Sequence, residues 1–138
     1  MPASPLALAD LLPLARAARA LAYAPYSGFH VGAAVLTRDG RTFSGCNIEN
    51  ASYGLCNCAE RTALFSAIAA GCRPGDFVAL AVIADTPEPV APCGACRQVM
   101  AELCDEATPV LLANTAGATR ETSVAALLPG SFRLPRAS

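Results

Sequence analysis

The first apolar pattern in the chain has the spacing of a helix. Leucines and alanines recur after Ser4-Pro5, a pair typical of an N-cap followed by a first-turn proline, and they continue to Tyr23. Pro13 lies inside this stretch, where it would remove a backbone hydrogen bond and clash with the preceding turn. The pattern therefore predicts a first helix that either kinks at Pro13 or begins near Asp10.

Four later stretches have the length and composition of β-strands. Residues 29–37 are small and β-branched, and an Asp-Gly pair at 39–40 predicts a tight hairpin that returns through residues 41–46. Residues 77–84 are almost continuously apolar, which is typical of a central strand covered on both faces. Residues 109–113 predict another buried strand.

Helices are predicted between and after these strands. Residues 58–70 repeat apolar side chains on one face and end before a glycine, residues 93–103 begin after a proline, and residues 124–128 form a short final segment. Alternating strands and helices predict an α/β protein with helices on both faces of one mixed sheet and the hairpin as its antiparallel edge. In such sheets the ligand site lies where helix N-termini gather beyond the carboxyl ends of the strands.

Three cysteines and one glutamate lie at the starts of two predicted helices. Cys58 and Glu60 fall in the first turn of one helix, and Cys93 and Cys96 straddle the start of the next. Zinc held by three protein ligands keeps a fourth position for water, and a carboxylate beside a ligand moves the proton of that water. Helix dipoles also favour the thiolates that zinc binds. The pattern predicts a catalytic zinc site with Glu60 as general acid and base.

The same residues allow other interpretations. Cys56 would complete a closed four-cysteine site that is purely structural, whereas Cys93 and Cys96 alone would suit a redox dithiol. Without the cysteines, Glu60 would be an ordinary glutamate in a first helical turn. The two cysteine motifs on successive helices together favour the zinc deaminase pattern.

Two arginines stand beside the cysteine motifs. Three thiolates around one divalent ion carry a net charge of −1, which weakens the metal as a Lewis acid unless donors draw charge from the sulfurs. Arg61 and Arg97, each one residue from a motif, are candidates for this role.

Composition narrows the class of protein. The 138 residues suit a single domain, residues 1–138. The chain has ten arginines, no lysine and eleven acidic residues, which gives a formal net charge of −1. The sequence therefore offers no basic cluster that would bind a nucleic-acid polymer. No apolar run has the length of a membrane span, and the odd count of seven cysteines without a secretory leader leads us to expect a reducing cytoplasm. The 54% hydrophobic content, much of it alanine, is explained equally well by self-association and by alanine-rich helices.

The chain resembles the small homotetrameric zinc-dependent cytidine deaminases over residues 23–132. The matching motifs are PYSGF at 25–29, VGAA at 31–34, NIEN at 47–50, CAERT at 58–62 and PCGACRQ at 92–98. The resemblance implies a three-layer α/β/α cytidine deaminase-like fold with a mixed sheet of about five strands. It also implies one Zn²⁺ per subunit, bound by Cys58, Cys93 and Cys96, and no organic cofactor.

The resemblance further assigns substrate-binding roles. Asn47 and Glu49 would bind the ribose hydroxyl, Phe29 would stack on the base, and the backbone around Ala59 would hold the pyrimidine. Gly54 and Cys56 differ from residues that are frequent at these positions in the family.

Two aromatic residues would be shared between subunits of the homotetramer. The family's C-terminal phenylalanine corresponds to Phe132 and would reach the site of a neighbouring subunit, and Tyr53 would line a pocket that two subunits form together.

The implied activity is hydrolysis of free cytidine and 2′-deoxycytidine to uridine and 2′-deoxyuridine, with release of ammonia, in pyrimidine salvage. Glu60 would carry protons from water activated by zinc to the substrate. An editing deaminase would need a cationic track, which this chain does not have. A deaminase of a modified nucleoside such as blasticidin S and a non-catalytic structural-zinc module remain as alternatives.

Overall fold

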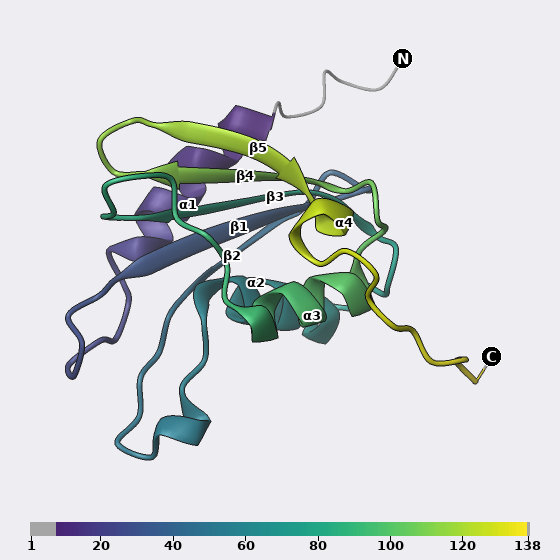
Figure 1. Cartoon of the computed structure of the whole chain (residues 1–138), viewed down its shortest axis with the longest axis horizontal. Coiled ribbons are helices and arrows are strands. Elements are labelled where there is room, and N and C mark those ends of the chain that lie inside the picture. Colours follow the sequence, from purple (N-terminus) through teal and green to yellow (C-terminus); the bar gives the residue numbers. More distant parts are fainter. Residues whose placement is uncertain (1–7, 138) are drawn as a thin grey trace.

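The computed structural model describes residues 8–137. The chain alternates short helices and strands as expected for an α/β protein (Figure 1). In chain order the elements are η1 (Leu8–Asp10), α1 (Leu11–Arg19), β1 (Val31–Thr37), β2 (Thr42–Cys46), η2 (Tyr53–Leu55), α2 (Ala59–Ala69), β3 (Phe77–Ala84), α3 (Gly94–Leu103), β4 (Pro109–Asn114), β5 (Thr119–Ser123) and α4 (Val124–Leu127).

Residues 8–137 contain one mixed sheet of five strands in the order β2-β1-β3-β4-β5. β3 and β4 are parallel, with Leu80 opposite Val110, and the other neighbouring pairs are antiparallel. The β1–β2 hairpin lies at one edge, and its turn passes through Gly40 at φ +86°. The predicted mixed sheet with an antiparallel hairpin at its edge is confirmed.

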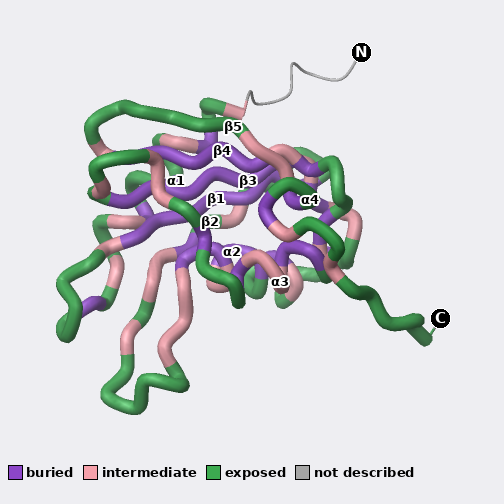
Figure 2. Tube along the Cα trace, in the orientation of Figure 1, coloured by how far each residue is buried: buried purple, intermediate pink, exposed green. Residues whose placement is uncertain are grey.

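Helices cover both faces of the sheet in three layers. β3 shows the division, because Leu80 and Val82 belong to the core beneath α2, α3 and α4, whereas Ala81 and Ile83 belong to the core beneath α1. Figure 1 shows α1 behind the sheet and α2 and α3 below it, and Figure 2 shows buried chain along the central strands. The predicted three-layer α/β/α architecture is confirmed.

Two glycines let helix backbones rest directly on the sheet. A Cβ atom added to Gly32 on β1 would lie 1.9 Å from the carbonyl oxygen of Ala15 on α1. A Cβ atom added to Gly45 on β2 would lie 2.5 Å from the backbone nitrogen of Ala63 and 2.6 Å from the carbonyl oxygen of Ala59, both on α2. Backbone atoms cannot turn aside as side chains do, so Gly45 sets how closely the start of α2 approaches the sheet.

The first helix differs from one of its two expected forms. It begins at Leu11, directly after Asp10, and Pro13 lies in its first turn, where a missing N–H costs no helical hydrogen bond. The kinked alternative is therefore wrong over the described residues. The helix also ends at Arg19 rather than continuing to Tyr23. The suggested Ser4-Pro5 cap lies outside the described residues.

The fifth strand, β5, was not located from the sequence. Its residues Thr119–Ser123 are polar and mostly exposed, because an edge strand pairs with β4 on one side only. An exposed polar run carries no apolar signal of a strand. The strand β1 also begins at Val31, two residues after the expected start.

Over residues 8–137, the longest apolar helices fall short of the length that a membrane crossing requires.

Candidate metal centre and active site

The site begins at the N-terminus of α2. Cys58 is the N-cap, with the extended backbone that lets its carbonyl oxygen accept the first helical hydrogen bond, from Thr62 N at 3.0 Å. Ala59 and Glu60 follow in the first turn and are buried, with Ala59 in the core against the sheet. The close contact at Gly45 holds this turn in place.

The N-terminus of α3 supplies two more thiols. Cys93 is the N-cap and its sulfur accepts a hydrogen bond from Cys96 N at 3.4 Å, as a capping side chain does. Cys93 is exposed at the helix start, whereas Cys96 is fully buried in the core. Gly94 begins α3 with open space where a Cβ would lie, so the glycine is not required for packing.

The sulfur atoms of Cys58, Cys93 and Cys96 all lie within 4.8 Å of one another. The sulfurs of Cys58 and Cys93 are 3.6 Å apart. Two thiolates bound to one zinc at ~2.3 Å in tetrahedral geometry would be about 3.8 Å apart, so the donor set fits this ion. A tetrahedral ion with these three ligands keeps one position open.

The groups around Cys58 stabilise the thiolate form of this cysteine. The hydrogen bond with Cys96, followed by those from Arg61 and Cys93, lowers the pKa of Cys58 to about 5. Because the Cys96 thiol keeps its proton in that hydrogen bond, the pKa of Cys96 is raised. The Nη2 of Arg61 donates to the Cys58 sulfur at 3.2 Å, and this contact in turn raises the pKa of Arg61. A positively charged group therefore lies beside the Cys58 sulfur.

Cys56 lies apart from this cluster. Within residues 8–137, the close group of potential metal ligands at this place comprises Cys58, Cys93 and Cys96. The sulfur of Cys56 instead accepts a hydrogen bond from Asn50 N at 3.3 Å. This geometry favours a three-cysteine site with an open position over the closed four-cysteine alternative.

Glu60 provides a buried carboxyl group beside the thiols. Its exposed fraction is 4%, and burial raises its pKa from 4.5 to about 7, with a further contribution from the charge of Cys58. A group that titrates near neutral pH both accepts and donates protons under working conditions. The arrangement suits general acid and base chemistry next to a metal.

The polar loop after β2 is tied to the start of β1. The side chain of Asn47 accepts a hydrogen bond from Val31 N at 2.8 Å and donates one to the carbonyl oxygen of Phe29 at 2.7 Å. The residue Phe29 is 43% exposed. A backbone bridge between Ile48 and Asn57, the residue before Cys58, connects this loop to the cysteine cluster.

Glu49 binds the turn that precedes Phe29. Its carboxylate accepts hydrogen bonds from the backbone N–H groups of Tyr26 and Ser27, at 2.9 and 3.1 Å, and from the hydroxyl group of Ser27. The Ser27 hydroxyl, followed by these backbone groups, lowers the pKa of Glu49. A carboxylate has about four acceptor positions, so this arrangement leaves one for a ligand.

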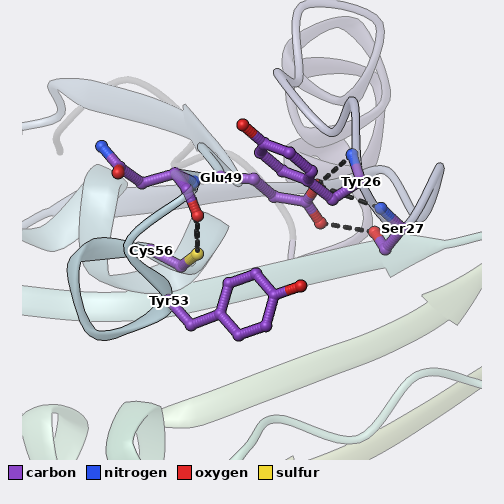
Figure 3. Close-up of a pocket in the computed structure, with 6 residues that line it drawn as sticks. Tyr26, Ser27, Glu49, Tyr53 and Cys56 are labelled. Carbon is purple, nitrogen blue, oxygen red and sulfur yellow. Dashed lines mark hydrogen bonds between the residues drawn. The ribbon is translucent and has the colours of Figure 1, made fainter.

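A surface pocket of about 280 Å³ lies between this turn and η2. Figure 3 shows Tyr26, Glu49 and Ser27 on one side of it and Tyr53 and Cys56 on the other. The residue Tyr53 is 77% exposed. The loop that carries it extends away from the body of the molecule (Figures 1 and 2).

Phe132 lies in the C-terminal segment after α4 and is 65% exposed. The structure thus brings together the cysteine cluster, Glu60 and Arg61, and it forms a second group from Phe29, Asn47 and Glu49. Tyr53 and Phe132 lie on two separate exposed segments of the chain.

Known proteins share this sequence and this structure. The family model described as the cytidine and deoxycytidylate deaminase zinc-binding region matches residues 8–113. The chain belongs to this family. A deaminase family member from Halalkalibacterium halodurans, named cytidine deaminase, is 63% identical over 115 residues, which are 83% of this chain and 86% of that protein.

Two further relatives agree. The cytidine deaminase of Sporosarcina psychrophila is 57% identical over 122 residues, which are 88% of each chain. The crystal structure of cytidine deaminase from Burkholderia pseudomallei has a TM-score of 0.90 and 61% identity, and it covers 92% of this chain and 100% of that chain. The three-layer fold and the family predicted from the deaminase motifs are confirmed.

Two residues near the deaminase site were missed by sequence reasoning. Ser27 fixes Glu49 and also accepts a hydrogen bond from Phe29 N at 3.0 Å, and Asn57 forms the bridge to Ile48. Ser27 lies in the turn motif and Asn57 directly precedes the ligand motif, so their positions were a signal. Their partners depend on how the two loops meet, which no spacing reveals.

Proposed function

We propose that this chain is a zinc-dependent cytidine deaminase acting on free cytidine and 2′-deoxycytidine. Water adds to C4 of the base and ammonia leaves, so that uridine or 2′-deoxyuridine remains. The observation that carries the proposal is the buried Glu60 carboxyl group, with its raised pKa, beside three converging thiols. The membership of the cytidine and deoxycytidylate deaminase family and the relatives named cytidine deaminase support it.

One Zn²⁺ per subunit would be held by Cys58, Cys93 and Cys96. When bound, it would supply a Lewis acid that makes a water molecule acidic enough to lose a proton near neutral pH. The positive charge of Arg61 on the Cys58 sulfur would offset the charge of three thiolates, so that the ion keeps this acidity.

Glu60 is proposed to carry the protons of the reaction. Its carboxylate accepts a proton from the attacking water and delivers it to N3 of the pyrimidine, and the second proton of that water reaches the departing amine by the same route. The pKa of about 7 supports both directions of transfer. Burial excludes bulk water from the group.

The nucleoside would lie over the loop that joins β2 to α2. Asn47 retains one N–H and Glu49 one acceptor position for a ribose hydroxyl, since their other positions are taken by the backbone and, on Glu49, also by the Ser27 hydroxyl group. Phe29 would stack on the base, and the backbone at Ala59 would bind its polar edge. The net charge of −1 and the 10 arginines without lysine support a free nucleoside rather than a nucleic-acid polymer.

A homotetramer with shared sites accounts for the exposed aromatic residues. Tyr53 and Phe132 are 77% and 65% exposed, and apolar side chains this exposed favour contact with another subunit. We infer that each contributes to the pocket of a neighbour. The single domain would function in pyrimidine salvage, and the seven cysteines, all free in residues 8–137, support a reducing cytoplasm.

The test follows the ultraviolet absorbance change as purified zinc-loaded protein converts cytidine to uridine. We expect turnover by the wild type and loss of at least ~10²-fold in Glu60→Gln, which keeps the shape of the side chain but cannot shuttle protons. Glu121→Gln, on the exposed strand β5, is the matched control and should keep full activity.

Three outcomes would contradict the proposal. A wild-type protein that binds one zinc but does not convert cytidine would indicate a non-catalytic module. Faster turnover of blasticidin S than of cytidine would indicate a modified nucleoside as substrate. Normal turnover by Glu60→Gln would remove this residue from the reaction.

A further inference from the structure

Arg97 follows the second cysteine motif but does not contact the sulfurs. Its Nε donates to the carbonyl oxygen of Pro92 at 2.8 Å, and its Nη1 donates to the carbonyl oxygen of Leu127, at the end of α4, at 2.9 Å. Its backbone N–H donates to the carbonyl oxygen of Cys93 at 3.0 Å. The Arg97 side chain therefore binds the carbonyl group directly before Cys93, while its backbone makes the ordinary helical hydrogen bond to the carbonyl group of Cys93 itself.

Cys93 needs such support more than the other two thiols of the cluster. Cys96 is fully buried inside α3, and Cys58 is half-buried and packs against the core. Cys93 is exposed and stands outside the helix, at the end of a loop. A side chain that packing does not hold depends on the backbone for its direction.

We propose that Arg97 is a positioning residue that directs Cys93 toward the other two thiols by tying the Pro92 carbonyl group to the end of α4. The planar guanidinium group reaches both carbonyl groups at once, which a single ammonium group cannot do in the same fixed geometry. The inference rests on the proposed zinc site and adds to it a residue that touches neither metal nor substrate.

The test measures how fast the zinc-loaded protein releases zinc to a chromogenic chelator, well below the unfolding temperature. In Arg97→Ala we expect release ~10-fold or more faster than in the wild type, as for the loss of a group that orients a metal ligand. Arg97→Lys, which retains one of the two carbonyl contacts, should restore part of the difference.

Arg73→Ala is the matched control. Arg73 also donates to two carbonyl groups, those of Ile68 and Cys72, at 3.3 and 2.8 Å, but outside the metal cluster. Its loss should cost similar stability and leave zinc release unchanged. A purely structural role for Arg97 would give the two alanine variants the same release rate, and this result would overturn the proposal.

Thermal unfolding of each variant is recorded in parallel. If Arg97→Ala does not fold, the zinc-release rate of Arg97→Lys tests the proposal in its place. Release faster than in the wild type supports the proposal, and an unchanged rate overturns it. Zinc release is measured without substrate, so a protein that binds zinc but does not convert cytidine defeats the proposed function and leaves this comparison valid.

Discussion

The Nη2 of Arg61 lies 3.2 Å from the sulfur of Cys58, the N-cap residue of α2. The two residues are three positions apart, so the helix itself places the guanidinium group beside the thiol. This contact helps lower the pKa of Cys58 to about 5, after the larger contribution from the hydrogen bond with Cys96.

Replacing Arg61 with alanine should weaken zinc binding. Without the guanidinium group, three thiolates share one ion with no opposing charge, and we expect a 10- to 100-fold loss of affinity. Competition with a chelator measures it. Arg61→Lys keeps the charge and should lose less, and Arg120→Ala, on the exposed strand β5, should behave as wild type. Equal affinities for all four proteins would contradict the role.

Gly45→Ala should displace the first turn of α2. The new Cβ atom would lie 2.5 Å from Ala63 N and 2.6 Å from Ala59 O, too close for either backbone to remain. We expect a loss of about 1–3 kcal/mol in the free energy of unfolding and a fall in activity, because the same turn carries Glu60. Gly54→Ala, with nothing within 4 Å, is the control for the substitution itself. If the two variants have the same free energy of unfolding and the same turnover rate, the close contact at Gly45 does not constrain the site.

Cys56 and Cys58 should differ in their effect on the metal. Cys58→Ala removes one of the three converging sulfurs and should abolish stoichiometric zinc binding, whereas Cys56→Ala should retain one zinc per chain. Metal analysis after dialysis of the two purified proteins gives the answer. Zinc lost from Cys56→Ala and retained by Cys58→Ala would indicate a different ligand set.

The pH dependence of substrate binding should change in Ser27→Ala. The Ser27 hydroxyl lowers the pKa of Glu49, so the carboxylate remains ionised to lower pH. Binding that depends on this carboxylate is present above its pKa and is lost as the pH falls through it. Because the variant raises that pKa, KM for cytidine should begin to rise at a higher pH than in the wild type.

Ser27→Thr provides the control, since it retains the hydroxyl group. KM is measured between about pH 3 and pH 7, a window that contains the usual pKa range of a glutamate. Superimposable pH profiles for wild type and Ser27→Ala would show that Glu49 does not bind substrate in its ionised form.

Much of the fold followed from periodicity and from turn residues. The apolar run that became β3 and the thiols that became the N-caps of α2 and α3 are local signals, and the structure agrees with them within a residue or two. The polar edge strand β5 has no such signal, because only its partner β4 makes it a strand. Its position depends on tertiary pairing.

The hydrogen-bond partners of Arg61 and Arg97 could not be told apart from the sequence. Arg61 and Arg97 each stand one residue from a cysteine motif, so the sequence offered the same role for both. In the structure the guanidinium group of Arg61 donates a hydrogen bond to the Cys58 sulfur, whereas that of Arg97 donates to two backbone carbonyl oxygens. Every residue carries a backbone carbonyl group, so no residue type marks these acceptors in a sequence.

The central strand β3 connects the two segments that supply the thiols of the cysteine cluster. Cys58 precedes this strand and Cys93 follows it, and β3 pairs with β1 on one side and β4 on the other. In the folded chain the three sulfurs meet while this strand is paired on both sides. Metal binding and folding of the sheet should therefore be linked, so that bound zinc raises the free energy of unfolding of the whole domain.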